Sequence, residues 1–348
     1  MTFLERLDGE ARDLLLAVAR PVSHRKGERL VRHGDPSRGA YVLKDGAAEA
    51  TVRLPGGETL SVARFGPGSV FGEMALIERG TCTATVTAAG DLSGWFIERD
   101  DFRSLVAQRV PAALRVQHAV TLALAEKVRQ LNARVLEVPT PEDRPVSSND
   151  RESDPLAKVK RSKQASFDFK PFLAHLPFFE GLDPADVDEI LAAASLLELP
   201  SGHAVFRAGH TGAAVFVVVR GAVEIHGRHE RRSRRIAVRG PGQLLGYMSA
   251  LEKRPHASDA VVREHALLLE IPRAMFEKAY FAATPLSSKL HRFVEKSLLM
   301  SLAESNRHLA RLISQARLRG AKEEGQALEK AVGGQIIAAA MDSGKASN

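Results

Sequence analysis

The residues from Phe71 to Leu76, Phe-Gly-Glu-Met-Ala-Leu, combine groups that can hold a small ligand. Gly72 has no Cβ, so the backbone there can come close to a bound molecule. We expect a short helix to begin directly after Gly72, with N–H groups near Met74 and Ala75 that form a ready site for an anion such as a phosphate. The run therefore indicates ligand binding.

The other side chains able to do chemistry form no recognisable reactive group. Cys82 is the single cysteine of the chain, so no internal disulfide can form. As a nucleophile it would need a base partner, and the sequence identifies none. The histidines near Arg228 have no ligand partners at zinc-like spacing, and the neighbouring arginines would repel a cation. We predict no catalytic residue, no metal site, no cofactor and no enzymatic activity.

The glycines of the chain recur in two sets at a nearly constant distance. Gly34 and Gly46 have counterparts 175 positions later, at Gly209 and Gly221. Further along the chain the offset becomes 174, as between residues 72 and 246. A constant offset with one single-residue deletion is typical of a duplicated domain, and it is far too long for a solenoid repeat.

The segment between the two copies has a different composition. Residues 138–170 are rich in Pro, Ser, Asp, Glu, Lys and Arg and have almost no aromatic side chains before Phe167. Such a composition buries too little apolar surface to order itself, which predicts a flexible linker. The second copy should begin with a helix, because Asp183 is a good N-cap and Pro184 suits the first helical position. We therefore expect a first domain at 1–136, a linker at 137–170, a second domain at 171–317 and a flexible tail at 318–348.

Within each copy, short β-prone runs alternate with Gly/Pro turns. Tyr41-Val42-Leu43 and the run 215–219 both end at a glycine turn. This pattern predicts a mainly β fold with flanking helices, made of two jelly-roll β-barrels. Apolar residues spaced three or four apart over 116–135 and 293–313 predict a long helix after each barrel. We expect these helices to pack on their own barrels. The alternative is that their apolar stripes form the interface of a homodimer.

One set of residues in the first copy carries a family resemblance. The set consists of Gly27-x-x-Leu30, Gly34-Asp35, Tyr41-Val42-Leu43, Gly46, Phe65–Leu76 and Ala84–Ala88. Through it, residues 1–135 resemble the cyclic-nucleotide-binding domain family, which includes regulatory subunits of cyclic-AMP-dependent kinases, cyclic-nucleotide-gated channels and catabolite-activator proteins. The second copy is similar over about 171–315, with its own version of the run at Leu245-Gly246-Tyr247-Met248-Ser249-Ala250.

The resemblance implies roles for residues of the first copy. The family's Glu, here Glu73, accepts hydrogen bonds from a ribose 2′-hydroxyl, and an Arg several residues later pairs with the cyclic phosphate. Counting through the loop places that Arg at Cys82, just before Thr83. A thiol cannot replace a charge-assisted pair, and the loss should cost on the order of 2–4 kcal/mol of affinity. The ligand-binding residues implied are Phe71, Gly72, Glu73, Met74, Ala75, Cys82 and Thr83, and the ligands implied are cyclic AMP, cyclic GMP or a nucleoside.

The second copy departs from the family at two positions. Tyr247 stands where the ribose-binding Glu is expected, and His256 stands at the position of the Arg. A histidine with an ordinary pKa near 6.5 is mostly neutral at pH 7, so it is a poor phosphate clamp. We expect the pocket of this copy to be filled or repurposed, with its equivalent positions at Gly246, Tyr247, Met248, Ser249, His256 and Ala257.

The formal net charge of +7 is concentrated in one stretch of arginines from Arg228 to Arg239. The stretch falls between two predicted strands, which favours a solvated hairpin tip; a docking surface for an acidic partner, membrane headgroups or RNA is the alternative. The N-terminus has no signal peptide, and no apolar run is long enough to span a membrane. We expect a cytoplasmic protein.

These features together predict a non-catalytic, ligand-sensing regulatory protein. The first domain would bind a small nucleotide-like ligand, and an unidentified protein effector would receive the signal. Specific DNA binding is not expected, because the glycine-interrupted residues after Leu318 are too few for a helix-turn-helix domain. The alternative is a scaffold whose two degenerate barrels bind partners and no nucleotide.

Overall fold

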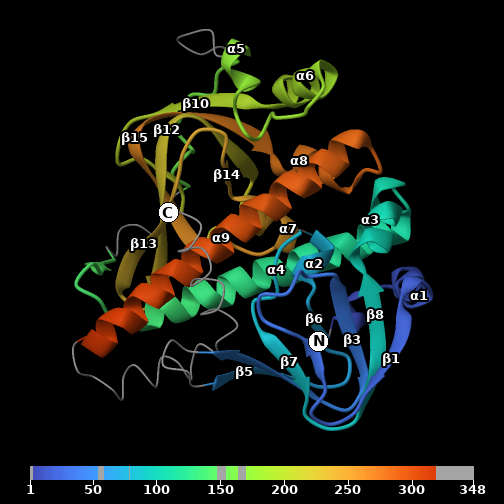
Figure 1. Cartoon of the computed structure of the whole chain (residues 1–348). Helices are drawn as coiled ribbons and strands as arrows, with labels where there is room; N and C mark the ends of the chain where they lie inside the picture. Colours follow the sequence, from blue (N-terminus) through green and yellow to red (C-terminus); the bar gives the residue numbers. More distant parts are fainter. Residues whose placement is uncertain (1–2, 54–58, 78, 147–153, 164–169, 319–348) are drawn as a thin grey trace. The chain divides into compact units, whose positions relative to one another are not determined.

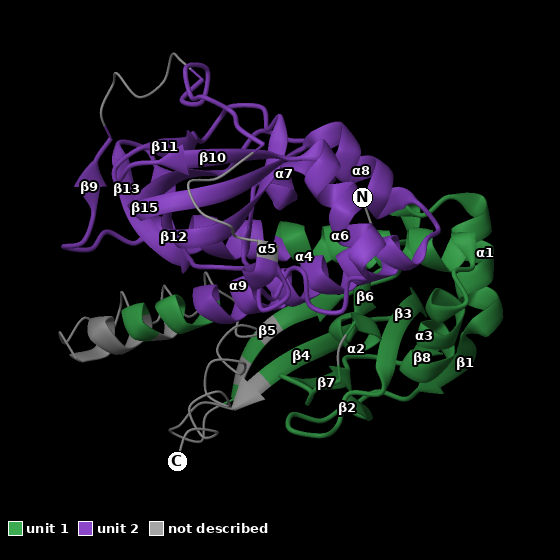
Figure 2. Cartoon of the chain, turned by 90° about the horizontal axis from the view of Figure 1, so that it is seen from above, with its two compact units in different colours: residues 1–126, 306–348 green, residues 127–305 purple. Residues whose placement is uncertain are grey.

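The computed structural model describes residues 3–53, 59–77, 79–146, 154–163 and 170–318 (Figure 1). Its contacts divide the chain into two compact units, shown in separate colours in Figure 2. Unit 1 comprises residues 1–126 and 306–348, and unit 2 comprises residues 127–305. The long helices α4 (Pro111–Glu137) and α9 (Pro285–Leu318) each contribute residues to both units.

Unit 1 contains two four-stranded antiparallel sheets. One has the order β1 (Arg20–His24), β8 (Leu92–Glu98), β3 (Gly39–Asp45), β6 (Val70–Phe71), and the other β2 (Arg29–Val31), β7 (Thr85–Ala88), β4 (Ala48–Arg53), β5 (Thr59–Phe65). Its helices are η1 (Leu4–Arg6), α1 (Gly9–Val18), α2 (Met74–Ile77), α3 (Arg99–Ala107) and the start of α4. A core cluster that includes Leu43, Ala50 and Val86 draws on both sheets, so unit 1 is a sandwich.

Unit 2 is built around two long strands, β12 (Ala214–His229) and β15 (Ser258–Pro272). They pair antiparallel, and shifts of register around residues 218–223 let them bend. The sheet has the order β10 (Ser195–Leu199), β15, β12, β13 (Arg232–Arg239), β9 (Arg144–Pro145), with β11 (Ala204–Phe206) on β15 and β14 (Leu244–Leu245) on β12. Its helices are α5 (Lys170–Leu173), α6 (Pro184–Ala193), α7 (Tyr247–Glu252), α8 (Arg273–Phe281), the end of α4 and most of α9.

The duplication extends to strand register and backbone conformation. Ala50 pairs with Ala63 in unit 1, and the residues at the same offsets, Ile225 and Ala237, pair in unit 2. Five pairs of glycines have matching positive φ angles: 27/202, 34/209, 46/221, 68/242 and 72/246. The mainly β class with flanking helices and the tandem repeat are therefore confirmed. Within the described residues the strand pairing does not close into a barrel, because the unit 1 strands form two separate sheets.

The predicted helices also occur. The helix after the first sandwich is α4, whose Val116 and Val120 are buried in the apolar core that α1 and α3 share with the sheet. The helix after the second is α9, with Leu298 and Leu309 fully buried. Helix α6 starts at Pro184 after its N-cap, as its sequence predicts.

The described parts of the expected linker are packed on unit 2. Leu156 lies in the apolar core of that unit with 4% of its surface exposed. Arg161 pairs with both carboxylate oxygens of Glu270, at 2.7 and 2.9 Å, and Ser162 bridges to Leu196. A few apolar and charged contacts thus hold this segment on unit 2, although its average composition is that of a flexible chain. The expected tail, from residue 319 onward, lies outside the described residues.

The arginine stretch is not the solvated hairpin tip that its composition favours. Arg234 is buried and donates to Asp143 at 2.6 Å, and Arg232 donates to the same carboxylate at 3.1 Å. Burial works against the ionised form of Asp143, but hydrogen bonds from Arg234, the Thr140 amide and Arg232 lower its pKa.

The hairpin turn itself, at Glu230 and Arg231, is exposed. The prediction of a solvated stretch is wrong for Arg234 and Arg239, which are buried and paired with acidic residues distant in the sequence.

Candidate functional site

In unit 1 the predicted binding run forms a tight turn between β6 and α2. Gly72 has a φ of +75°, and a Cβ there would lie 2.8 Å from the carbonyl oxygen of Gly39. Only glycine fits this close approach without strain. Glu73 and Met74 are half-buried, and the buried Ala75 donates its N–H to the Gly72 carbonyl at 2.9 Å. The Ala75 amide is therefore used within the turn.

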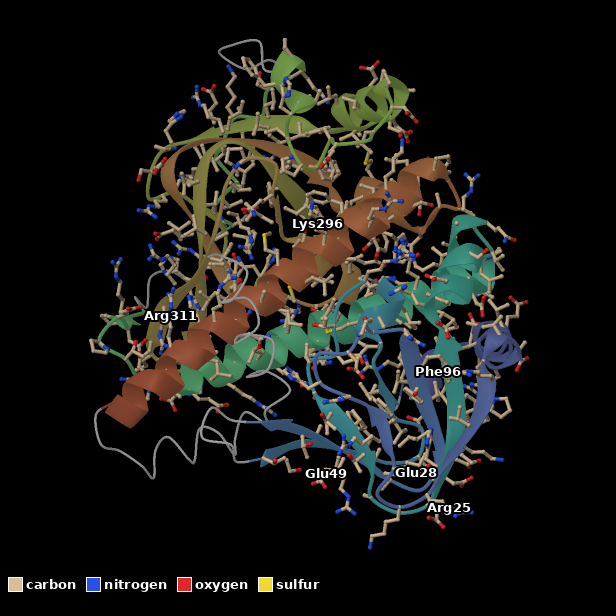
Figure 3. All side chains as sticks on the ribbon, in the orientation of Figure 1. Arg25, Glu28, Glu49, Phe96, Lys296 and Arg311 are labelled. Atoms are coloured by element: carbon tan, nitrogen blue, oxygen red, sulfur yellow. The ribbon has the colours of Figure 1, made fainter. Side chains whose placement is uncertain are left out.

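Aromatic side chains line the sandwich beside this turn. Tyr41 stacks on Phe71, with ring centroids 5.0 Å apart, and its hydroxyl donates to the Leu30 carbonyl at 3.1 Å. The ring centroid of Phe65 lies 4.9 Å from that of Phe71. Phe96, labelled in Figure 3, lies on β8, and its ring centroid is 4.7 Å from that of Tyr41. Burial raises the pKa of Tyr41. Phe71 and Phe96 are buried, so these rings pack the sandwich beside the turn, with Tyr41 and Phe65 partly exposed.

The backbone confirms the alignment of Cys82 with His256. The Cys82 N–H donates to Asp35 and its carbonyl accepts from Gly34; the His256 N–H donates to His210 and its carbonyl accepts from Gly209. All four distances lie between 2.8 and 3.0 Å. The Cys82 thiol is half-buried, and burial together with the nearby Asp35 raises its pKa. A neutral thiol thus occupies this position, and Thr83 follows it in the loop before β7.

In unit 2 the corresponding turn is less exposed. Gly246 has a φ of +76° and precedes α7, which begins at Tyr247. Tyr247 is 5% exposed and is hydrogen-bonded to Ser301 of α9. Burial raises its pKa, so the phenol is neutral. Ser249, also buried, donates its hydroxyl to the Arg254 carbonyl.

His256 is a buried, neutral ring. Its imidazole lies flat on Phe206, and burial lowers its pKa to about 4, with the charges of His210 and Arg129 as smaller causes. A group with this pKa carries no charge at pH 7 and cannot clamp a phosphate as an arginine would.

A cavity of about 180 Å³ lies over this turn in unit 2. The structure brings all six predicted positions of the second copy to its wall: Gly246, Tyr247, Met248, Ser249, His256 and Ala257. The opposite wall comes from two helices, with Arg129, Asn132 and Leu136 from α4 and Ser301, Glu304 and Ser305 from α9. The pocket of the second copy is therefore only partly filled by Tyr247.

The helix residues at this cavity were missed by sequence reasoning. The spacing of Val128 and Leu136 reveals an apolar stripe on α4, but nothing in that spacing shows that the stripe meets the turn at Gly246. Arg129 pairs with Glu252 of α7, and the Ser305 hydroxyl donates to Asn132 at 2.6 Å. These contacts link the two helices to the turn within unit 2.

No helix within the described ranges has both the length and the apolar character needed to cross a bilayer.

The chain was compared with models of known protein families. Residues 21–109 and 196–282 both match the family model described as the cyclic nucleotide-binding domain. The two matches together span about half of the chain, and each falls on the β-strands of one of the two units.

Individual proteins show the same similarity. The cyclic AMP receptor protein of Thermus thermophilus is 35% identical over 107 residues, which cover 30% of this chain and 48% of that protein. The chain thus matches about half the length of this curated relative. Among solved structures, the regulatory domain of Toxoplasma gondii PKA with cAMP is 17% identical over 86% of this chain and 92% of that one, with a TM-score of 0.33. The N-terminal domain of a transcriptional regulator from Streptomyces coelicolor A3(2) is 27% identical over 36% of this chain and 89% of that one, also with a TM-score of 0.33.

Proposed function

The chain belongs to the cyclic nucleotide-binding domain family, and we propose on that basis that it is a non-catalytic regulator that senses a ligand in its first domain and signals through a protein effector. The ligand proposed for the first domain is cyclic AMP, cyclic GMP or a nucleoside. A cytoplasmic location belongs to the same proposal.

One observation carries the choice of the first domain. The turn at Gly72 has the positive φ and the tight packing on Gly39 that require glycine, and the residue after it is Glu73, a carboxylate that can accept hydrogen bonds from a ribose. The stacked rings of Tyr41 and Phe71 lie beside it. At Cys82 the site has a neutral thiol, so the binding of a phosphate is weaker than an arginine would make it.

The packing of unit 1 offers a route from the site to the helices. Leu76 of α2 lies in the same apolar cluster as Phe102 of α3 and Val116 of α4. A ligand that moves the turn at Gly72 therefore changes the packing of α3 and α4. Such coupling requires that the ligand bind the two helix arrangements with different affinity.

Calorimetric titration with cyclic AMP, cyclic GMP, cyclic dinucleotides and nucleosides tests this proposal. Binding is expected for at least one of these ligands, and Glu73→Ala is expected to weaken it at least tenfold. Glu189→Ala removes an exposed carboxylate from α6 and is the matched control. If none of the ligands binds, or if Glu73→Ala leaves the affinity unchanged, the first-domain site is refuted, and the scaffold function remains.

A further inference from the structure

The cavity of unit 2 has a chemistry different from that of a cyclic-phosphate site. We infer that it binds an uncharged small molecule that carries hydrogen-bond acceptors on an apolar body, the class that nucleosides exemplify, and that it excludes the phosphate ester of the same molecule. The argument rests on the charges, the donors and the apolar wall of the cavity.

All the cationic side chains that line the cavity already have carboxylate partners. Arg129 pairs with Glu252, Arg228 with Asp259 at 2.5 Å, and Arg239 with both oxygens of Glu304 at 2.9 and 3.1 Å. These side chains are at most 23% exposed. A phosphate could gain a guanidinium only by displacing a buried carboxylate, which would then lose its partner.

The position that would supply a free cation is also neutral. His256 stands there with a pKa of about 4, lowered mainly by burial, with smaller contributions from His210 and Arg129. A ligand phosphate would raise that pKa only by overcoming the burial of the ring. Among the residues described, the three arginines of the wall are thus compensated by Glu252, Asp259 and Glu304, and His256 adds no charge at pH 7.

Two donors on α4 have no protein acceptor. The Nε atom of Arg129 is buried and has no hydrogen-bond partner. Asn132 accepts from Ser305 through Oδ1, and no described residue accepts from its amide nitrogen. Both residues line the cavity, three positions apart on the same face of α4. The Arg129 Nε is too enclosed to meet a ligand, whereas the half-buried Asn132 borders the cavity, so acceptor atoms of a ligand facing α4 would be stabilised by the amide of Asn132.

The remaining wall is mainly apolar. Besides several serines it includes Leu136 of α4, Ile225 and Ile236 of the β12–β13 hairpin, and Phe206, which also packs on His256 and Phe216. This surface suits an aromatic or heterocyclic body. Acceptors on one edge, an apolar face and no charge describe a nucleobase or a nucleoside better than a nucleotide.

The test compares ligands that share a base and a ribose and differ by the cyclic phosphate. Adenosine, guanosine and inosine are titrated into the full chain by calorimetry, each beside its 3′,5′-cyclic monophosphate. At least one nucleoside is expected to bind unit 2 at least tenfold more tightly than its cyclic monophosphate. If no nucleoside binds there, or if the cyclic monophosphate binds this site equally well, the inference is overturned.

Matched variants assign the binding to one unit. Ala237→Phe fills the unit 2 cavity, and Ala63→Phe makes the same change at the equivalent register position of unit 1. Loss of nucleoside binding in Ala237→Phe alone supports the inference, whereas loss in Ala63→Phe alone overturns it and supports the first-domain site. Asn132→Leu, which removes a donor with little change in the size of the side chain, is expected to weaken binding at least tenfold. Unchanged affinity in this variant would refute the role given to α4.

Discussion

The imidazole of His256 lies flat on the ring of Phe206, with the ring centroids 3.9 Å apart and the planes inclined by 9°. A Cβ on Gly212 would lie 2.9 Å from the imidazole Nε2, so the backbone of that glycine closes the space on another side. Burial, with smaller contributions from His210 and Arg129, lowers the pKa of the ring and keeps it neutral. The second domain thus has an aromatic pair at the position where a cyclic-phosphate site has a cation.

Protonation of His256 should make the stability of unit 2 depend on pH. The folded-state pKa is about 4 and the unfolded value is near 6.5, so between these values the unfolded chain binds a proton that the folded chain does not. Stability therefore decreases as the pH falls from 6.5 to 4, by about 3 kcal/mol for this group. His256→Asn should flatten the decrease in urea unfolding curves measured across this range. The exposed His175→Asn should leave the profile of the parent protein intact, and an identical slope in both variants would contradict the prediction.

The pair between Arg239 and Glu304 should stabilise the packing of α9 within unit 2. Arg239 is 9% exposed, and Glu304→Gln leaves its charge without a carboxylate. We expect a loss of about 2–3 kcal/mol, measured by chemical unfolding. Glu277→Gln breaks an i,i+4 pair with Arg273, at the partly exposed surface of α8, and should cost only about 0.5 kcal/mol. Equal losses would show that burial of the first pair has no effect.

The segment around Leu156 should contribute to stability although its composition is that of a linker. Leu156→Ala removes a buried side chain from the core of unit 2 and should cost about 2–4 kcal/mol. Lys158→Ala, at an exposed position two residues away, should stay within about 0.5 kcal/mol of the parent protein. Unfolding midpoints in urea measure both. If Leu156→Ala leaves the stability unchanged, the segment around Leu156 is not bound to unit 2.

Restoring an arginine should affect the two domains differently. Cys82→Arg is expected to raise the affinity of the first domain for cyclic AMP at least tenfold, because a guanidinium can bind two phosphate oxygens. His256→Arg places a cation near Arg129 in a buried site, so it should destabilise unit 2 and give no such gain. Calorimetry and thermal melting of both variants check this. Equal gains in affinity for cyclic AMP in the two variants would contradict this prediction.

Substitutions at two glycines of unit 2 should distinguish the cost of backbone strain from the cost of a steric clash. Gly202 and Gly221 have φ angles of +83° and +85°, but a Cβ on Gly202 meets nothing within 4 Å, whereas one on Gly221 would lie 2.4 Å from the His265 carbonyl oxygen. Gly202→Ala should cost about 1–2 kcal/mol, and Gly221→Ala clearly more. If the two variants have equal free energies of unfolding, the strand at His265 moves to make room for the new Cβ.

The sequence by itself determined the features that depend on local conformation and spacing. The offsets of 175 and 174 identified the duplicated domain, and the matching glycines have matching φ angles because a left-handed turn needs glycine wherever the fold is repeated. The mainly β class, the helix at Pro184 and the equivalence of Cys82 and His256 followed from the same periodicity and counting. These properties belong to short stretches of chain, so they can be read from short stretches of sequence.

Only the tertiary structure decided where the polar groups find their partners. It paired Arg234 with Asp143 and placed Leu156 in an apolar core, although composition favoured a solvated turn and a flexible linker. It also brought Asn132 and Glu304 to the turn at Gly246, from helices far away in the sequence. Burial and charge pairing depend on contacts between distant residues, and a single sequence contains no local signal for them. For that reason the sequence identified the two turns that we propose as ligand sites, and the structure supplied the walls, the charge pairs and the donors from which the proposed ligand class was inferred.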